Sequence, residues 1–297
     1  MELAEIKGKA RLVYLLADVT DKGRMESIFE EFKPEVIYHA AAYKHLPMME
    51  KNPSEAVRVN ILGTKIVADF ALKFGVEKFI MISTDKAINP TSIMGCTKRV
   101  AELYVQSLGK SNYGYAQFVT TRFGNVMGSS GSVFTIFQRQ IKSGGPLTVT
   151  HPEVCRYFMS VPEACRLVLE AGAIGQGGEI FLFDMGTPIS ILDLAKRMIE
   201  LSGKEQGKDI EIVFTGLREG EKLSEELFYQ TENTIPTHHP KILKAKIQEM
   251  DFKEISILVD LFYELIQDRN ELKMVALMKE IVPEFKSTYY KFRVSEG

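Results

Sequence analysis

Apolar residues in the first half of the chain form short unbroken runs that alternate with longer stretches of helical spacing. This alternation is typical of parallel strands joined by crossover helices. Strands are predicted at residues 11–17, 35–40, 77–83 and 116–122, with helices between 21 and 34, at 54–74 and at 95–108. The pattern predicts an α/β fold with a Rossmann-like, doubly wound parallel sheet.

The second half is more broken, and a smaller α/β unit is expected there. Helices are predicted at 133–142, 161–172 and 191–201, strands at 179–183 and 210–214, and two amphipathic helices at 255–266 and 272–281. We expect the Rossmann-like domain to cover residues 1–128 and about 158–176, the smaller domain 129–157 and 177–250, and the C-terminal helices 251–297.

Composition narrows the class of protein. The 297 residues are 45% hydrophobic and 26% charged, which excludes a mainly disordered chain. A net charge of -2 provides no basic field for nucleic acid. Three cysteines without a CxxC pair suggest no metal site. No apolar run approaches the ~18–20 residues of a membrane span, and the N-terminus does not resemble a signal peptide, so we expect a cytoplasmic chain without membrane contact.

A Gly-rich turn is missing before the first predicted strand. In dinucleotide-binding sheets this turn lets backbone N–H groups approach the pyrophosphate. Only Gly8 precedes the strand. We therefore expect the chain to lack an opening β–α–β unit of about 30 residues or more, and to bind a dinucleotide weakly on its own.

Five short motifs occur in the order and at the spacing of one known family. They are Ala17-Asp18-Val19-Thr20-Asp21, His39-Ala40-Ala41-Ala42-Tyr43-Lys44-His45, Ser83-Thr84-Asp85-Lys86 with Met94-Gly95-Cys96-Thr97-Lys98, Arg122-Phe123-Gly124-Asn125-Val126, and Arg218-Glu219-Gly220-Glu221-Lys222-Leu223. The chain closely resembles the UDP-N-acetylglucosamine 4,6-dehydratases of bacterial capsule, O-antigen and protein-glycan synthesis, in the extended short-chain dehydrogenase/reductase superfamily. The resemblance covers roughly residues 12–285. It implies NAD or NADP bound by the first domain and a UDP-sugar bound by the second.

The candidate catalytic residues follow the strand at 77–83. Thr84, Asp85 and Lys86 supply a hydroxyl, a carboxyl and an amine at consecutive positions. The resemblance implies oxidation at the sugar C4, loss of water across C5 and C6, and return of the hydride to C6. It places Thr84 at the C4 hydroxyl and makes Asp85 the acid and Lys86 the base, which requires a protonated Asp85 and a neutral Lys86. The alternative is a turn whose Asp caps the next segment.

Met94 and Lys98 complete the catalytic set. They lie four residues apart and so share one face of a helix. The family signature usually has Tyr followed by Lys at this spacing, and the resemblance implies that Lys98 holds the nicotinamide ribose. A thioether cannot transfer a proton, so we expect Met94 to be a packing or positioning residue rather than an acid or base.

The other candidates are contacts to the cofactor or the substrate. Asp18 suits the exocyclic amine of adenine, or caps the helix that follows it. Small side chains at 40–42 let a planar cofactor pass close to the backbone. The alternative is that they allow a helix to pack tightly against the strand. Arg218 suits a diphosphate and Glu221 a ribose hydroxyl. The alternative for Arg156 or Arg218 is a surface arginine that binds no ligand. The candidate cofactor-binding residues are Asp18, Val19, Ala40, Ala41, Ala42, Asn60, Ser83, Lys98 and Phe123, and the substrate-binding ones are Lys44, Asn125, Ser132, Arg156, Arg218 and Glu221.

Three functions stay open on the sequence. The first is the 4,6-dehydratase, the second is a UDP-N-acetylglucosamine epimerase of the same family, and the third is an inactive fragment with a binding or structural role. We expect a homo-oligomer formed through the two long helices of the first domain, and no nucleic-acid partner. Because relatives with Met at the Tyr position are often preceded by membrane-spanning helices, the resemblance allows an inner-membrane anchor in the natural full-length form.

Overall fold

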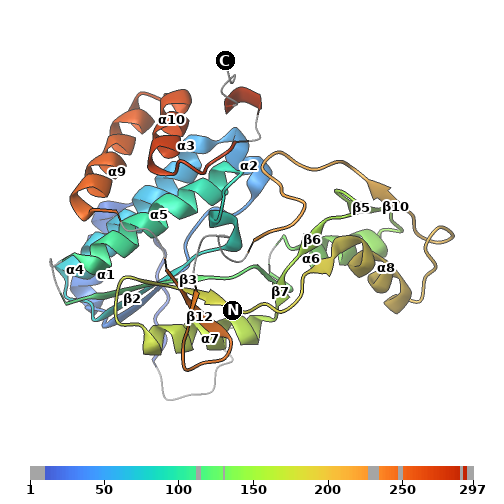
Figure 1. The fold of residues 1–297 in the computed structure, drawn as a ribbon, viewed down its shortest axis with the longest axis horizontal. Coiled ribbons are helices and arrows are strands. Elements are labelled where there is room, and N and C mark those ends of the chain that lie inside the picture. Colours follow the sequence, from blue (N-terminus) through green and yellow to red (C-terminus); the bar gives the residue numbers. More distant parts are fainter. Residues whose placement is uncertain are drawn as a thin grey trace.

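A six-stranded sheet forms the centre of the molecule (Figure 1). The computed structural model describes residues 11–111, 115–129, 131–226, 234–246, 250–287 and 290–292. In spatial order the strands are β1 (Val36–His39), β2 (Lys78–Ile82), β3 (Gln117–Arg122), β8 (Glu179–Phe183), β12 (Ile242–Ala245) and β11 (Thr234–Pro236). The first four are parallel, whereas β12 is antiparallel to β8 and β11 to β12.

Helices cover both faces of this sheet, as a doubly wound α/β fold requires. One face carries α7 (Val161–Ile174), below the sheet in Figure 1. The main hydrophobic core lies on the other face. The helices on that face are α1 (Lys22–Phe32), α3 (Pro53–Ala56), the π-helical η2 (Val57–Gly63), α4 (Thr64–Lys73) and α5 (Ile93–Lys110). The predicted fold class is confirmed.

Side-chain caps set the starts of several helices where the sequence predicts them. Asp21 accepts a hydrogen bond of 2.9 Å from the Arg24 N–H at the start of α1. Ser160 accepts one of 3.3 Å from the Glu163 N–H at the start of α7. These side chains satisfy N–H groups that have no partner within the helix.

The first predicted strand does not form. Residues 11–17 have no regular secondary structure and are exposed, with Leu16 95% exposed. A strand needs a neighbour to satisfy its backbone groups, and no described strand pairs with this segment. Strand β1 pairs only with β2 among the described residues, so its outer edge is open. The strand predicted at residues 11–17 from its run of hydrophobic residues is therefore wrong.

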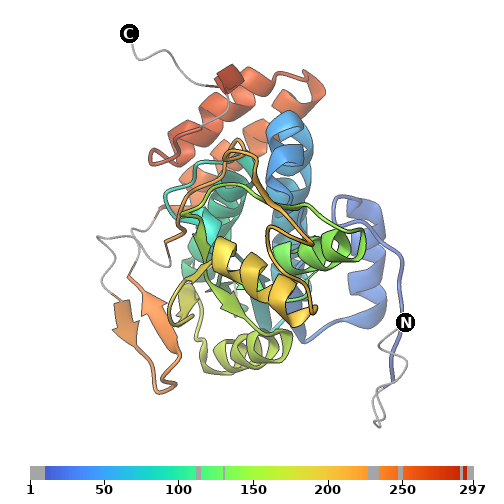
Figure 2. The same ribbon diagram turned by 90° about the vertical axis from the view of Figure 1, so that its right-hand side faces the viewer.

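A smaller lobe stands to the right of the sheet in Figure 1 and faces the viewer in Figure 2. It has its own apolar core, which includes Phe137, Leu147 and Ile199. Its larger elements are α6 (Val133–Lys142), α8 (Ile191–Leu201) and the parallel pair β5 (Leu147–Val149) and β10 (Ile212–Phe214). Shorter elements near the junction are β4 (Asn125–Val126), β6 (Cys155–Arg156), β7 (Phe158–Met159), β9 (Ile189–Ser190), α2 (Leu46–Lys51) and η3 (Asp85–Ala87), with η4 (Tyr290–Phe292) near the C-terminus.

The boundary between sheet and lobe differs from the predicted one. Strands β8, β11 and β12 were assigned to the smaller domain but belong to the central sheet. All five residues of β8 are buried, and the strand pairs with β3 in parallel. A buried strand of this kind completes the main sheet, because only there does it find partners on both sides.

The two long helical segments of the first domain are covered by the chain's own C-terminal helices. Helices α9 (Phe252–Gln267) and α10 (Glu271–Ile281) pack on α5, above the sheet in Figure 1. Every residue of α5 from Ile93 to Leu108 is buried. The α5 surface is thus covered within the chain itself, and the homo-oligomer stays a prediction.

No helix in the described part of the chain combines the length and the apolar character that a membrane span needs.

Candidate functional site

Four of the predicted catalytic residues, Thr84, Lys86, Met94 and Lys98, line a cleft of about 460 Å³ between the sheet and the smaller lobe. The fifth, Asp85, lies outside this lining with its side chain fully buried. Because β1, β2 and β3 are parallel, the segments that follow them emerge at one edge of the sheet, where such folds bind ligands. The lobe supplies the opposite wall through Thr148, Arg156 and Ile191. The predicted residues in the lining are Ala40, Ala42, Lys44, Ser83, Thr84, Lys86, Met94, Lys98, Asn125, Ser132, Arg156, Arg218 and Glu221.

Thr84, Asp85 and Lys86 form one hydrogen-bonded chain at the end of β2. The Thr84 hydroxyl donates to Asp85 Oδ1 over 2.9 Å, and Lys86 Nζ donates to the same oxygen over 2.8 Å. The Asp85 side chain is fully buried, and its Oδ2 has no hydrogen-bond partner among the described residues. An acidic group in this position can exchange protons with both neighbours.

The charge on Lys86 differs from the sequence prediction. Burial opposes its ammonium form, but the nearby carboxylates of Asp85 and Glu225 outweigh burial and raise the pKa of Lys86. Lys86 is therefore charged in this structure, whereas the predicted base is neutral. The discrepancy arises because the prediction considered burial and did not include a second buried carboxylate.

Met94 and Lys98 share one face of α5 and both line the cleft, as their spacing predicts. Lys98 Nζ donates to the Ile82 carbonyl over 2.8 Å, which fixes the amine beneath the end of β2. Burial lowers the pKa of Lys98 to about 8. The cleft thus contains one amine that titrates near neutral pH and one that stays protonated.

Gly95 allows α5 to begin against the catalytic loop. A Cβ at this position would lie 2.2 Å from the Lys86 carbonyl oxygen, which is closer than any non-bonded contact allows. The glycine therefore keeps the first turn of α5, and with it Met94, close to Lys86.

The substrate-side candidates form a second polar group on the lobe. Arg156 Nη2 lies 2.9 Å from Glu221 Oε1, which also accepts a bond of 3.1 Å from the Thr150 hydroxyl. Glu221 Oε2 accepts from the Arg218 N–H over 3.1 Å. Glu221 thus holds Arg156 and the Arg218 backbone, while the exposed Arg218 side chain reaches the cleft.

Three predicted cofactor contacts have partners within the protein, and their role toward a cofactor stays a prediction. The Asn60 amide accepts from Tyr43 N over 2.8 Å and donates to Tyr43 O over 3.0 Å, so it clamps the loop after β1. Asp18 is exposed and accepts two bonds of 2.8 Å from Thr20. Phe123 stacks on Phe183 with ring centroids 5.4 Å apart. Val19 and Ala41 also lie outside the cleft lining.

Several residues at the site were not predicted from the sequence. Tyr43, His45 and Thr150 line the cleft. Glu225 lies below it, with a side chain 2% exposed. In the sequence, Glu225 is one of two adjacent glutamates shortly after Leu223. Such residues usually face solvent, so the sequence did not point to a buried carboxylate.

Glu50 of α2 gives a pH-dependent contribution to stability. It accepts from the Ile93 N–H over 2.7 Å at the start of α5. Burial raises its pKa to about 7, and the charge of Glu219 adds to this effect. Since the folded pKa lies above the unfolded value, the folded state loses stability as pH rises from about 4.5 through 7.

We therefore expect Glu50→Gln to be more stable than the wild type by about 2 kcal/mol at pH 8 and nearly equal at pH 4. The amide oxygen still accepts from Ile93, so only the charge changes. Urea unfolding at the two pH values measures this difference. A stability difference that is the same at both pH values would contradict the assignment.

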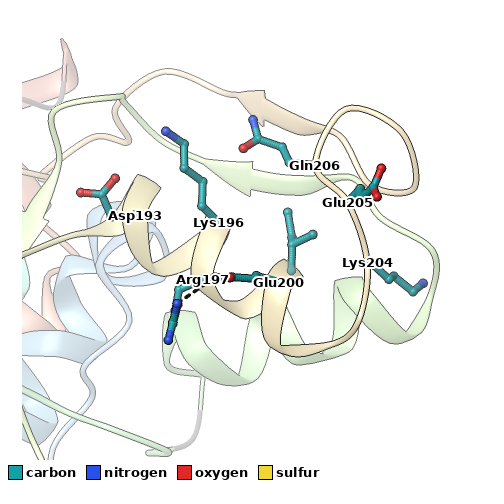
Figure 3. Close-up of a pocket in the computed structure, with 8 residues that line it drawn as sticks. Asp193, Lys196, Arg197, Glu200, Lys204, Glu205 and Gln206 are labelled. Atoms are coloured by element: carbon teal, nitrogen blue, oxygen red, sulfur yellow. Dashed lines mark hydrogen bonds and ion pairs between the residues drawn. The ribbon is translucent and has the colours of Figure 1, made fainter.

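A second hollow lies on the outer surface of α8 (Figure 3). Its lining alternates in charge, and Arg197 pairs with Glu200 at 2.9 Å across its wall. None of the predicted site residues lines it. The cleft at the end of the parallel strands is therefore the candidate functional site.

The cleft fits the nicotinamide end of a dinucleotide. Ala40 and Ala42 leave room beside the backbone, and the Lys98 amine lies where a ribose hydroxyl could accept from it. Among the described residues, no Gly-rich turn joins a strand of the central sheet to a helix beside these positions, because the turn with Gly128 and Gly131 precedes α6 of the lobe. The residues present thus match one half of the cofactor's binding site.

Comparison with known proteins identifies the family. The family described as polysaccharide biosynthesis protein matches residues 1–247. The chain belongs to this family. The capsular polysaccharide biosynthesis protein CapD of Staphylococcus aureus is 50% identical over 277 residues, which are 93% of this chain and 45% of that protein. The chain therefore spans less than half the length of this member of the family.

Two further relatives differ from each other in their named activities. The UDP-N-acetylglucosamine 4,6-dehydratase (inverting) of Campylobacter jejuni is 35% identical over 75% of this chain and 64% of its own length. The UDP-glucose 4-epimerase of Rickettsia akari is 37% identical over 73% of this chain and 62% of its own. The family resemblance is thus confirmed, and it includes both reaction types.

Solved structures agree with the fold. Pen from Bacillus thuringiensis has a TM-score of 0.74 and 33% identity, covering 85% of this chain and 82% of that one. A DesIV double mutant, a dTDP-glucose 4,6-dehydratase from Streptomyces venezuelae solved with NAD, has a TM-score of 0.67 and 20% identity over 76% of this chain and 73% of its own. The second match shows a shared fold.

Proposed function

We propose that the cleft binds UDP-N-acetylglucosamine and NAD or NADP, and that the protein is a nucleotide-sugar 4,6-dehydratase of bacterial surface-polysaccharide or glycan synthesis. The hydrogen-bonded chain of Thr84, Asp85 and Lys86 carries this proposal. Elimination of water needs an acid and a base on neighbouring carbons. A carboxyl group bonded at 2.9 Å to a hydroxyl and at 2.8 Å to an amine supplies both.

A bound nicotinamide would supply reversible hydride transfer, with the sugar C4 as donor and C6 as the final acceptor. Lys98 would hold the adjoining ribose, and Ala40 and Ala42 would leave space for the ring. Lys98, with its pKa lowered to about 8 by burial, is still mostly protonated at neutral pH and can donate a hydrogen bond to a ribose hydroxyl.

Protons move in a balanced sequence along the three consecutive side chains. Thr84 Oγ1 takes the proton of the C4 hydroxyl as C4 is oxidised and passes its own proton to Asp85 Oδ1. Asp85 then gives this proton to the C6 hydroxyl, which leaves as water, while Lys86 takes the C5 proton. Lys86 returns a proton to C5 when C6 is reduced, so each side chain ends as it began.

Lys86 must be neutral before it accepts the C5 proton. Once Asp85 holds the proton from the C4 hydroxyl, the carboxyl group 2.8 Å away no longer stabilises the ammonium, and Lys86 releases its own proton to solvent. The neutral amine and the carboxylic acid are then the base and the acid of the proposed elimination. Lys86 recovers its proton from solvent after turnover, so the charged state in the structure is one proton loss away from the reactive state.

The lobe would hold the nucleotide. The Arg218 guanidinium lines the cleft and suits a diphosphate, which it can bind through two parallel hydrogen bonds. Arg156, fixed by Glu221, adds a buried positive charge on the same wall. Lys44, Asn125 and Ser132 line the cleft toward the sugar.

The product distinguishes the proposed dehydratase from an epimerase, which the Rickettsia relative favours. Turnover is measured on the extended protein, which is this chain with a Gly-rich β–α–β unit added before Met1. The addition supplies the Gly-rich turn whose N–H groups bind the pyrophosphate of the cofactor. A product lighter than the substrate by one water supports the dehydratase. A product of unchanged mass supports the epimerase, and binding of both ligands without turnover supports an inactive protein.

A further inference from the structure

Glu225 lies beside Lys86 at the base of the cleft. Its Oε1 is 3.6 Å from Lys86 Nζ, and its side chain is 2% exposed. Its Oε2 is buried and has no hydrogen-bond partner among the described residues. A carboxylate is costly to bury without partners, so a lone structural role does not account for it.

The segment that carries Glu225 is anchored on both sides of the cleft. Cys155 N donates to Leu223 O over 2.9 Å, and Lys222 Nζ donates to the Ile88 carbonyl over 2.9 Å. Glu226, the next residue, accepts from the Asn89 amide over 2.7 Å. These bonds tie the segment to the loop that follows Lys86, so the position of Glu225 is fixed by its backbone.

Besides their effect on each other, Lys86 and Glu225 feel three further charged groups, which are Asp85, Arg156 and Lys222. Asp85 lies 2.8 Å from the amine, Arg156 acts on both groups, and Lys222 acts on Glu225. Glu221 in turn pairs with Arg156. Burial raises the pKa of Glu225, and the positive charge of Lys86 opposes that rise. Lys86 is thus a single cation shared by two buried carboxylates.

We propose that Glu225 is a positioning residue that holds the Lys86 amine together with Asp85 and thereby determines when that amine can accept a proton. The inference rests on the proposed role of Lys86 as the base. While Glu225 is ionised, its charge opposes loss of the Lys86 proton. Once Glu225 is protonated, loss of that proton leaves the neutral amine that elimination requires.

The test measures the titration of the Lys86 amine directly. The chain is labelled with traces of acetic anhydride across a range of alkaline pH, and mass spectrometry of peptides reports the reactivity of each lysine. At the pH where Lys86 loses its proton Glu225 is ionised, so Glu225→Gln removes a negative charge. We expect the pKa of Lys86 to fall by about 1–3 units in this variant.

Glu226→Gln is the matched control, because it changes the adjacent carboxylate, which contacts Asn89 and Lys222 rather than Lys86. We expect the Lys86 titration to be unchanged in this variant, and a Glu225→Asp variant to fall between the wild type and Glu225→Gln. Equal Lys86 titrations in Glu225→Gln and Glu226→Gln would overturn the proposal. The wild type provides a check that needs no variant: Lys86 that titrates at or below the ~10.4 of a free lysine would also overturn it.

Neither NAD nor a sugar is present in this measurement. A negative result therefore removes the role of Glu225 and leaves the proposed function untouched. Failure of the product assay on the extended protein would instead leave the labelling result standing as a property of the ion pair.

Discussion

Replacing Glu102 by Gln is expected to lower the free energy of unfolding by about 3–5 kcal/mol. Glu102 of α5 accepts from Arg122 Nε over 2.8 Å and from Nη2 over 2.6 Å, and both side chains are at most 1% exposed. Arg99 Nη1 lies 3.3 Å from the same carboxylate. An amide at this position would leave two buried guanidinium groups facing a neutral side chain.

The pH dependence of this effect has a defined sign. Burial opposes the charge of Glu102, but Arg122 and Arg99 outweigh burial and lower its pKa. The stabilisation is therefore present above the unfolded pKa and is lost as pH falls through the folded one. The difference between the wild type and Glu102→Gln should shrink in acid.

Glu200→Gln is the control for this prediction. Glu200 forms an exposed ion pair with Arg197 at 2.9 Å, with both side chains more than 60% exposed. Its loss should cost at most about 0.5 kcal/mol. Chemical denaturation of the three proteins measures both values, and equal losses in the two variants would contradict a buried structural role for Glu102.

Asp85→Asn and Lys86→Ala are each expected to reduce turnover of the extended protein by at least ~10²-fold. Asn cannot give a proton to the departing C6 hydroxyl, and Ala cannot take one from C5. Hydride transfer from C4 does not require Lys86, so a transient rise in NADH absorbance should remain detectable in Lys86→Ala. The rise should be weaker in Asp85→Asn, which lacks the acceptor for the C4 proton.

Met94→Ala is the matched control for these two variants. Met94 lines the same cleft and is 4% exposed, but its thioether cannot carry a proton. We expect only a modest loss of turnover, from less precise packing. Wild-type rates in Asp85→Asn and Lys86→Ala would remove both residues from the mechanism, and a loss in Met94→Ala as large as theirs would contradict its role as a packing residue.

Local patterns in the sequence predicted the parts of the site that depend on a single element. The spacing of Met94 and Lys98 places both on one face of α5, because the helical period is fixed. The position of Thr84 after β2 follows from the parallel arrangement of strands. The caps at Asp21 and Ser160 were likewise visible, since each depends on residues within one turn.

Features that depend on distant segments were not predictable in the same way. Glu225 reaches Lys86 only because residues of the smaller lobe cross onto the loop after β2. The charge on Lys86 depends on its distances to the carboxylates of Asp85 and Glu225, which no local sequence pattern predicts. Residues 11–17 have a strand-like composition, but a strand forms only with a neighbour, and none of the described strands pairs with them.

The proposed function assumes that the lobe binds the nucleotide by itself. We expect calorimetry on the chain as given to show binding of UDP but only weak binding of NAD or NADP, because the residues for the pyrophosphate were not found in it. Arg218→Ala should weaken UDP binding by about tenfold or more. Micromolar binding of NAD by this chain would reveal a phosphate site outside the cleft that we describe.

The most direct test of the central claim is the mass of the sugar nucleotide that the extended protein forms from UDP-N-acetylglucosamine and NAD. Calorimetry first establishes that both ligands bind, and the reaction is then run in D₂O. The account predicts a product that has lost one water and carries deuterium at C5, since Lys86 returns a solvent-exchanged proton there. A product of unchanged mass, or no product with both ligands bound, would contradict it.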